Sequence, residues 1–162
     1  MKPIIFTGVD PGKNGAIASI DADGTIRKIS RFSQADTEGR IALIIADHIA
    51  ELGDGQHAAS IERVGAMPRQ GLSSTFTFGR VTGEAWAGLL LSKARVQAVT
   101  ASRWQSDFGL PKKEEYAAHK RMLKAQAETR WARKFVLDEV DAVWLAEWSR
   151  LKGPWSRQGE GW

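Results

Sequence analysis

The N-terminal part of the chain contains three short strand-like segments joined by turn sequences, and this arrangement constrains the fold more than any other feature. Residues 4–9 and 16–20 are apolar and are predicted to form buried strands, whereas residues 25–32 alternate like a half-exposed strand. The connections DPGKNG and DADG contain the Asp and Gly residues that are typical of tight turns. We therefore predict an antiparallel meander of three strands.

The rest of the chain alternates between helical and strand-like patterns. Residues 37–51 are predicted to form a helical crossover, with Thr37 as a possible N-cap, that sets a fourth strand at 57–62 parallel to the first strand. The remaining predicted elements are a strand over 95–100 and helices over 72–92, 101–108, 112–131 and 138–151.

The predicted fold class is therefore α/β, with a mixed five-stranded sheet flanked by helices. The sheet combines the three-strand antiparallel meander with two parallel strands, and this order matches the RNase H-like fold. We expect a single domain over residues 1–152, followed by a C-terminal tail over 153–162.

Four acidic residues occupy positions that suggest one shared site. Asp10 and Glu62 each end an apolar run, and Asp138 and Asp141 lie three residues apart on one face of the last predicted helix. A carboxylate at the end of a buried strand is unfavourable unless it is paired or binds a metal. In the RNase H-like order, Asp10 and Glu62 would lie on neighbouring central strands. We therefore predict one divalent-metal site formed by all four carboxylates.

Three of these acids also have a structural interpretation. Asp10 begins Asp-Pro-Gly, which is good turn chemistry, and Asp138 is placed to cap the last helix. Glu62 has Arg63 as a neighbouring partner for an ion pair. Asp141 lies one turn inside the helix, where capping does not account for it.

The proposed ligand set suits Mg²⁺, which prefers oxygen ligands and retains several bound waters. Two Mg²⁺ ions about 3.5–4 Å apart can supply the nucleophile and the charge stabilisation that phosphodiester hydrolysis needs.

The chain has no cysteine, which excludes disulfides and thiolate metal sites and is compatible with the cytoplasmic location that we expect. No apolar stretch reaches ~18 residues, so no membrane association is expected. A GxxxxGKS/T motif is missing, which argues against a nucleotide cofactor.

Positive charge gathers after Glu62. Residues 1–62 carry a net charge of −3, residues 63–100 a net charge of +4 and residues 101–162 a net charge of +3. A carboxylate cluster framed by basic residues suits a metal enzyme that acts on a polyanion, whereas the alternative is a solvated basic surface. The candidates for contact with DNA phosphates are Arg69, Arg80, Lys112, Lys113, Lys120 and Lys124. His119 is expected to be a surface residue rather than a general base.

Three segments, GVDPGKNGAIA (8–18), SIERV (60–64) and DEVDAVWLAEW (138–148), resemble the motifs of the RuvC family of Holliday junction resolvases in order and spacing. The resemblance covers nearly the whole chain. It implies a crossover junction endodeoxyribonuclease that acts as a homodimer and nicks four-way DNA junctions symmetrically.

The resemblance also implies a cofactor and a set of ligands. The cofactor would be Mg²⁺, with two ions per active site and Mn²⁺ as a possible substitute. The family motif gives ligand roles to Asp10, Glu62, Asp138 and Asp141, and Asp10 would bridge both metals.

The chain departs from the family pattern in two places. The loop after Glu62 lacks the aromatic residue that stacks at the junction in similar bacterial enzymes, so Met67 or Arg69 would wedge or stack instead. The chain is also short beyond the last helix, as in compact phage-borne relatives, which opens the substrate range to other branched DNA. Two alternatives stay open: a non-catalytic nucleic-acid-binding domain, and a ribonuclease that acts on RNA or RNA–DNA hybrids.

Gly79 and Gly83 lie one turn apart inside a predicted helix, where each glycine costs up to ~1 kcal/mol. Two explanations are open. The glycines could pack against the sheet, or they could form the seam of a two-fold dimer, which suits a junction with two equivalent strands to cut.

Overall fold

The computed structural model describes residues 2–34, 37–65, 71–110 and 116–156. One sheet holds all five strands in the order β3-β2-β1-β4-β5. The strands are β1 (Ile4–Asp10), β2 (Ala16–Ile20), β3 (Ile26–Arg31), β4 (Gln56–Arg63) and β5 (Arg95–Thr100). The first three pair antiparallel, whereas β4 pairs parallel with β1 and with β5. The predicted mixed sheet is confirmed.

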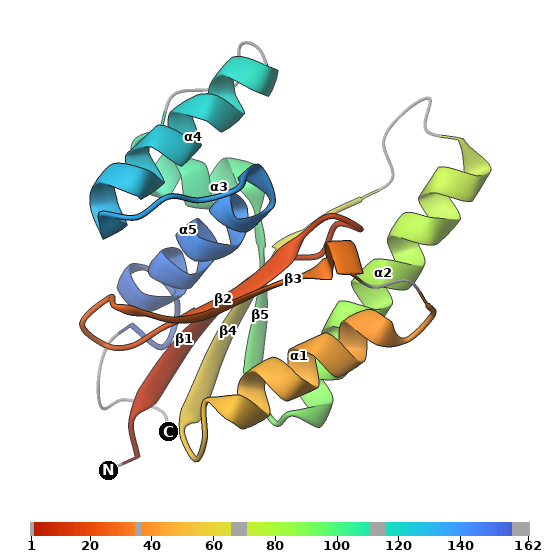
Figure 1. Cartoon of the computed structure of the whole chain (residues 1–162), viewed down its shortest axis with the longest axis horizontal. Coiled ribbons are helices and arrows are strands. Elements are labelled where there is room, and N and C mark those ends of the chain that lie inside the picture. The colour runs from red at the N-terminus through yellow and green to blue at the C-terminus, as the bar shows by residue number, and fades with distance from the viewer. Residues whose placement is uncertain (1, 35–36, 66–70, 111–115, 157–162) are drawn as a thin grey trace.

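Helices cover both faces of this sheet (Figure 1). On one face lie α1 (Arg40–Glu51) and α2 (Leu72–Leu91), and a short 3₁₀ helix, η1 (Phe32–Gln34), follows β3. On the other face, α5 (Leu137–Leu151) crosses the strands, and α3 (Ala101–Asp107) and α4 (Tyr116–Trp131) lie beside it.

The start of α1 differs from the prediction. Its N-cap is Gly39, which has a φ of 79°, and not Thr37. The backbone carbonyl of Thr37 instead accepts a 3.3 Å hydrogen bond from the N–H of Arg40. Thr37 therefore belongs to a turn before the helix, and the chain reverses at a residue whose left-handed conformation favours glycine.

Each face of the sheet contributes to its own apolar core, because successive side chains on a strand point to opposite faces. Val9, Ile17 and Ile61 pack under α1 and α2 in one cluster. On the other face, Ala16 and Ala18 of β2 pack against a cluster that includes Trp104, Trp144 and Leu145. Trp144 and Trp148 of α5 lie in this core and are 8% and 6% exposed.

The helix α5 passes directly over Gly8 of β1. A Cβ atom at this position would lie 2.1 Å from the carbonyl oxygen of Ala142 and 2.3 Å from the backbone nitrogen of Ala146, so only glycine fits. Residues two apart on a strand share a face, so Asp10 points to the same side as Gly8. This close approach sets the first turns of α5 beside the carboxyl end of β1.

No helix in the described parts of the chain is long and apolar enough to cross a membrane.

Candidate active site

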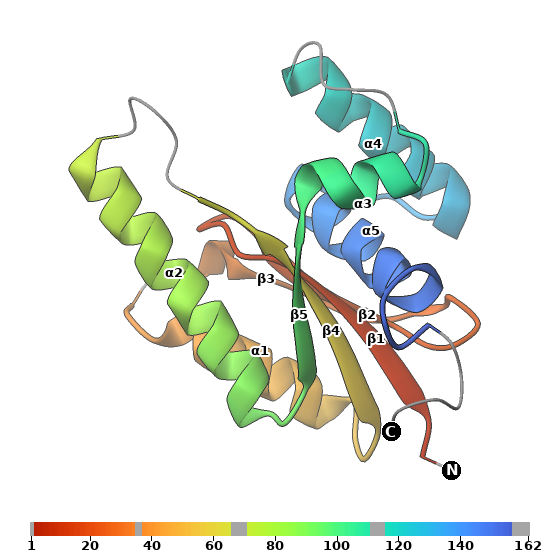
Figure 2. The same cartoon turned by 180° about the vertical axis from the view of Figure 1, so that it is seen from behind.

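Asp10 and Glu62 lie side by side at the ends of the two central strands. The parallel register pairs Val9 of β1 with Ile61 of β4, so Asp10 and Glu62 are the next residues on each strand. Figure 2 shows β1 and β4 running together in the middle of the sheet. The predicted placement of these two acids on neighbouring central strands is therefore confirmed.

Asp138 and Asp141 reach the same region from the N-terminal end of α5. The N-cap of this helix is Val136, whose carbonyl accepts a 3.1 Å hydrogen bond from the N–H of Glu139. The Glu139 carboxylate in turn accepts a 3.2 Å hydrogen bond from the N–H of Val136. Asp138 is thus not the N-cap, and the capping explanation for it is wrong.

Burial and neighbouring charges shift the pKa of Asp10. Burial, followed by the negative charge of Asp141, raises the pKa of Asp10 to about 6, although Lys120 and a backbone N–H oppose the shift. That N–H belongs to Gly12 and donates to Asp10 Oδ1 at 3.2 Å. Asp10 therefore has the turn role that its sequence suggested, and the neighbouring acids also raise its pKa.

The pKa of Glu62 is also raised, and to a higher value than that of Asp10. Burial raises its pKa to about 7, the charges of Asp10 and Asp141 add to the shift, and a hydrogen bond from Trp104 opposes it. The indole nitrogen Nε1 of Trp104 donates to Glu62 Oε2 at 3.0 Å.

Asp141 is 8% exposed, and its two carboxylate oxygens have different surroundings. Oδ2 forms an ion pair with the ammonium of Lys120 on α4. Oδ1 is buried and has no hydrogen-bond partner among the described residues. An unpaired buried carboxylate oxygen is unfavourable, and a cation or a polar ligand would satisfy it.

The chemistry of the four carboxylates fits a hard divalent cation. All donors are oxygen, two of the acids hold raised pKa values, and one buried oxygen lacks a partner. Within the described residues, no three His, Cys, Asp or Glu side chains converge closely enough to hold a metal as they stand. The acids form a loose cluster in which Lys120 provides compensating charge.

An open cleft of about 610 Å³ gives access to this acid cluster. Asp10 and Asp138 line it, together with Gly12, Asn14, Lys120 and Arg121. Carboxylates and the α4 cations Lys120 and Arg121 line the same cleft, so it can take a cation and a phosphate group together.

Solved structures share this arrangement of elements, although no family model and no curated protein matches the sequence. The structure of T. thermophilus RuvC in complex with Holliday junction substrate superposes with a TM-score of 0.65 at 13% identity, covering 92% of this chain and 97% of that chain. A second Thermus thermophilus RuvC structure gives a TM-score of 0.61 at 13% identity, covering 91% and 96%. The chain has the RuvC fold. The RNase H-like architecture expected from the sequence is thereby confirmed.

The predicted DNA-binding residues have different surroundings in this RuvC-like fold. Lys120 lies in the acid cluster, Lys124 is 3.8 Å from Glu128, and Arg80 is paired with Glu84 on α2. The other three predicted residues, Arg69, Lys112 and Lys113, lie outside the described residues, as does the predicted wedge residue Met67.

Sequence reasoning missed two features of the site. His119 is 8% exposed, so its expected surface position is wrong, because this side of α4 packs toward α5. Trp104 contacts Glu62 from 42 residues away, and no spacing in the sequence signals this contact.

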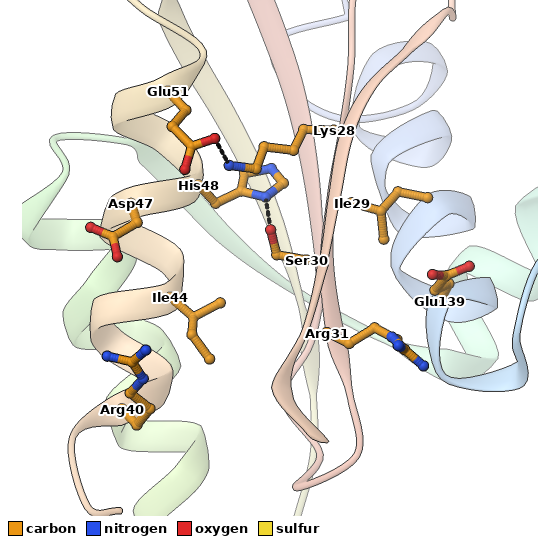
Figure 3. A pocket seen from close by; sticks show the side chains of 10 residues that line it. All are labelled: Lys28, Ile29, Ser30, Arg31, Arg40, Ile44, Asp47, His48, Glu51 and Glu139. Carbon is orange, nitrogen blue, oxygen red and sulfur yellow. Dashed lines mark hydrogen bonds and ion pairs between the residues drawn. The ribbon is translucent and has the colours of Figure 1, made fainter. Parts of the chain in front are cut away.

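A second cleft, of about 370 Å³, lies between β3 and α1 (Figure 3). Its buried His48 is bonded at both ring nitrogens, at 3.0 Å to Ser19 and at 2.9 Å to Ser30, and Ser19 continues to Thr7 at 2.8 Å. Burial, with a contribution from Lys28, lowers the pKa of His48 to about 3. A neutral histidine with both nitrogens bonded is a structural link between sheet and helix.

Proposed function

We propose that this protein is a Mg²⁺-dependent, structure-selective endodeoxyribonuclease that resolves Holliday junctions and other branched DNA by paired symmetric nicks. The observation that carries the proposal is the cluster of four carboxylates where α5 meets the ends of β1 and β4. The RuvC fold supports it, since T. thermophilus RuvC was solved in complex with Holliday junction substrate.

The four acids would hold the metal. Asp10 and Asp138, which line the cleft, would be ligands together with Glu62 and Asp141. Bound Mg²⁺, or Mn²⁺ in its place, would supply an activated water and stabilise charge on the leaving oxygen.

The reaction that we propose is hydrolysis. A bond forms between the water oxygen and phosphorus, and the bond from phosphorus to the 3′-oxygen breaks, so that a proton ends on the 3′-oxygen. The products carry 5′-phosphate and 3′-hydroxyl ends. Lys120 and Arg121, which also line the cleft, would orient the DNA by its phosphates, which position a strand without reading its sequence.

We also propose that the enzyme is a homodimer and that α2 forms the seam. The exposed face of α2 is an uncharged stripe with a helical spacing of three and four, which consists of Leu72, Phe76, Gly79, Gly83, Ala87 and Leu90. Leu72 and Phe76 are 91% and 73% exposed. An uncharged stripe is complementary to a second copy of itself about a two-fold axis.

The glycines of α2 fall into two groups with different surroundings, and this difference supports the dimer seam. A Cβ atom on Gly88 would lie 2.9 Å from the carbonyl oxygen of Ala42 on α1, so this glycine packs inside the chain. Cβ atoms on Gly79 or Gly83 would meet no atom within 4 Å among the described residues. Packing on the sheet does not explain these two, whereas close approach of a partner helix does.

A charge placed on the stripe tests the dimer. Phe76→Glu should convert the protein from a dimer to a monomer in analytical ultracentrifugation. Leu43→Glu is the matched control, because Leu43 is also a large exposed apolar residue, at 55%, but lies on α1 outside the stripe. A wild-type protein that sediments as a monomer at micromolar concentration would contradict the homodimer.

The activity is tested with a labelled immobile four-way junction, in Mg²⁺ or EDTA, beside duplex DNA and an RNA–DNA hybrid. We expect nicks in pairs on opposing strands, only with Mg²⁺, and products that a ligase reseals. Junction binding without nicks under all metal conditions would favour a non-catalytic binding domain. Cleavage of the hybrid alone would identify a ribonuclease.

A further inference from the structure

The indole of Trp104 is fully buried and its single polar atom is directed at the acid cluster. Trp104 lies on α3, is 0% exposed and packs in the core beneath α5. Its Nε1–H donates to Glu62 Oε2 at 3.0 Å. Indole nitrogen is a donor only, and a buried donor needs an acceptor, so this bond fixes the ring and the carboxylate relative to each other.

Two other buried tryptophans and the partly buried Trp131 show that an indole in this core does not need an acceptor from the acid cluster. Trp144 Nε1 donates to the backbone carbonyl of Leu123 at 3.2 Å, and Trp131 Nε1 donates to that of Gly24 at 3.0 Å. Trp148 Nε1 donates at 2.9 Å to Asp107, a carboxylate outside the acid cluster. Trp104 differs from all three because its acceptor is one of the four clustered acids.

Because the acceptor is a side chain, the bond from Trp104 restricts Glu62 in a way that a bond to a backbone carbonyl would not. The bond to Oε2 holds the carboxylate in one orientation, in which Oε1 is left free of the indole for a ligand. Outer partners that orient a ligating side chain typically change metal affinity 10–100-fold when they are removed.

We propose that Trp104 is a positioning residue, which orients the Glu62 carboxylate so that one oxygen serves the metal of the active site. This inference rests on the proposed function, because it assigns Glu62 a metal. It adds α3 to the elements that build the site.

Trp104→Phe is the direct test, since it keeps an aromatic ring in the core and removes the N–H. Mn²⁺ binding, measured by calorimetry without DNA, should weaken about 10-fold or more. The rate of junction cleavage should fall while the dissociation constant for the junction stays the same. Trp148→Phe is the matched control, because it deletes the same donor from a carboxylate outside the cluster, and its Mn²⁺ affinity should equal that of the wild type.

The outcomes separate this inference from the function on which it rests. A wild-type protein without Mn²⁺ affinity would overturn the proposed function and the role of Trp104 with it. Normal Mn²⁺ affinity in Trp104→Phe, or equal losses in both variants, would overturn the role of Trp104 alone.

If Trp104→Phe does not fold, a second measurement tests whether Trp104 positions Glu62. In ¹H–¹⁵N spectra, one indole N–H signal should shift in Glu62→Gln, and the same signal should shift when Mg²⁺ is added to the wild type. If no indole signal responds to both changes, Trp104 does not position a metal ligand.

Discussion

The carboxylates that lie near the two ends of α5 are in opposite electrostatic situations. Near the C-terminal end, Glu147 is 2% exposed and accepts hydrogen bonds from Arg130 at 2.9 Å and from Arg150 at 2.8 Å. Burial favours a higher pKa for Glu147, but the bonds from the two arginines outweigh burial and hold its pKa below the usual value. Near the N-terminal end, Asp10 and Glu62 have raised pKa values beside Asp141.

This difference separates a structural acid from a candidate ligand. Both oxygens of Glu147 are satisfied by cations of the same chain, so nothing further is needed there. Asp141 has Lys120 on one oxygen and no described partner on the other. Loss of a fully paired buried acid destabilises the fold because it leaves its cations unpaired, whereas a group of acids with too little compensating charge favours the binding of a cation.

Removing one acid from the N-terminal end should have the largest effect. Asp10→Asn keeps the turn acceptor but removes a ligand charge, so junction cleavage should fall more than about 100-fold while junction binding persists. Single-turnover cleavage and a gel-shift assay measure the two quantities. Asp21→Asn is the matched control, because Asp21 also caps a turn, at 3.0 Å to the N–H of Asp23, and lies at the hairpin between β2 and β3. Retained cleavage in Asp10→Asn would remove Asp10 from the site.

A substitution near the C-terminal end of α5 should lower stability and leave cleavage unaffected. Glu147→Gln leaves two arginines without their carboxylate, and should lower the unfolding free energy by about 3 kcal/mol in denaturant titration. Cleavage per folded molecule should stay close to that of the wild type. Asp138→Asn, on the same helix, should show the reverse pattern. If Glu147→Gln lost cleavage without losing stability, the division between the two ends would be wrong.

Divalent metal should stabilise the fold through the N-terminal end only. A ligand at 100 times its dissociation constant adds about 2.7 kcal/mol to the unfolding free energy. We expect a rise of this order with saturating Mg²⁺ in the wild type and in Glu147→Gln, and a much smaller rise in Asp10→Asn. Thermal unfolding with Mg²⁺ or EDTA measures it, and equal shifts in all three proteins would place the metal elsewhere.

The pH dependence of stability should also differ between wild type and Asp10→Asn. The folded protein holds the Asp10 proton up to a pH of about 6, whereas the usual value is 3.8, so the stability from this group is complete below pH 3.8 and is lost as the pH rises through 6. Without metal, the wild type should therefore lose about 2–3 kcal/mol relative to Asp10→Asn between pH 4 and pH 8. Denaturant titrations in EDTA check this. A difference that does not change with pH would mean that Asp10 is not perturbed.

Much of the fold could be predicted because local signals agree with the tertiary structure. The turns DPGKNG and DADG determine the hairpins, and the apolar runs that end in Asp10 and Glu62 indicate two buried strands with polar ends. The four acids follow from their positions on predicted elements, since a strand end and a helix face are readable from the sequence.

Other parts of the site depend on contacts that local patterns do not encode. The bond from Trp104 to Glu62 arises because α3 begins directly after β5 and sets the indole beneath α5. The cap of α5 was missed because Glu139 reaches back to the N–H of Val136, an arrangement in which the N-cap residue itself is apolar. Tertiary packing decides both features.

The location of bound metal tests the central claim most directly. Crystals of the wild-type protein soaked in Mn²⁺ would be measured at an energy where manganese scatters anomalously. We predict anomalous density among the carboxylates of Asp10, Glu62, Asp138 and Asp141, and none at this place in Asp10→Asn crystals. Anomalous density found only away from these four residues would contradict a metal-dependent active site at the N-terminal end of α5.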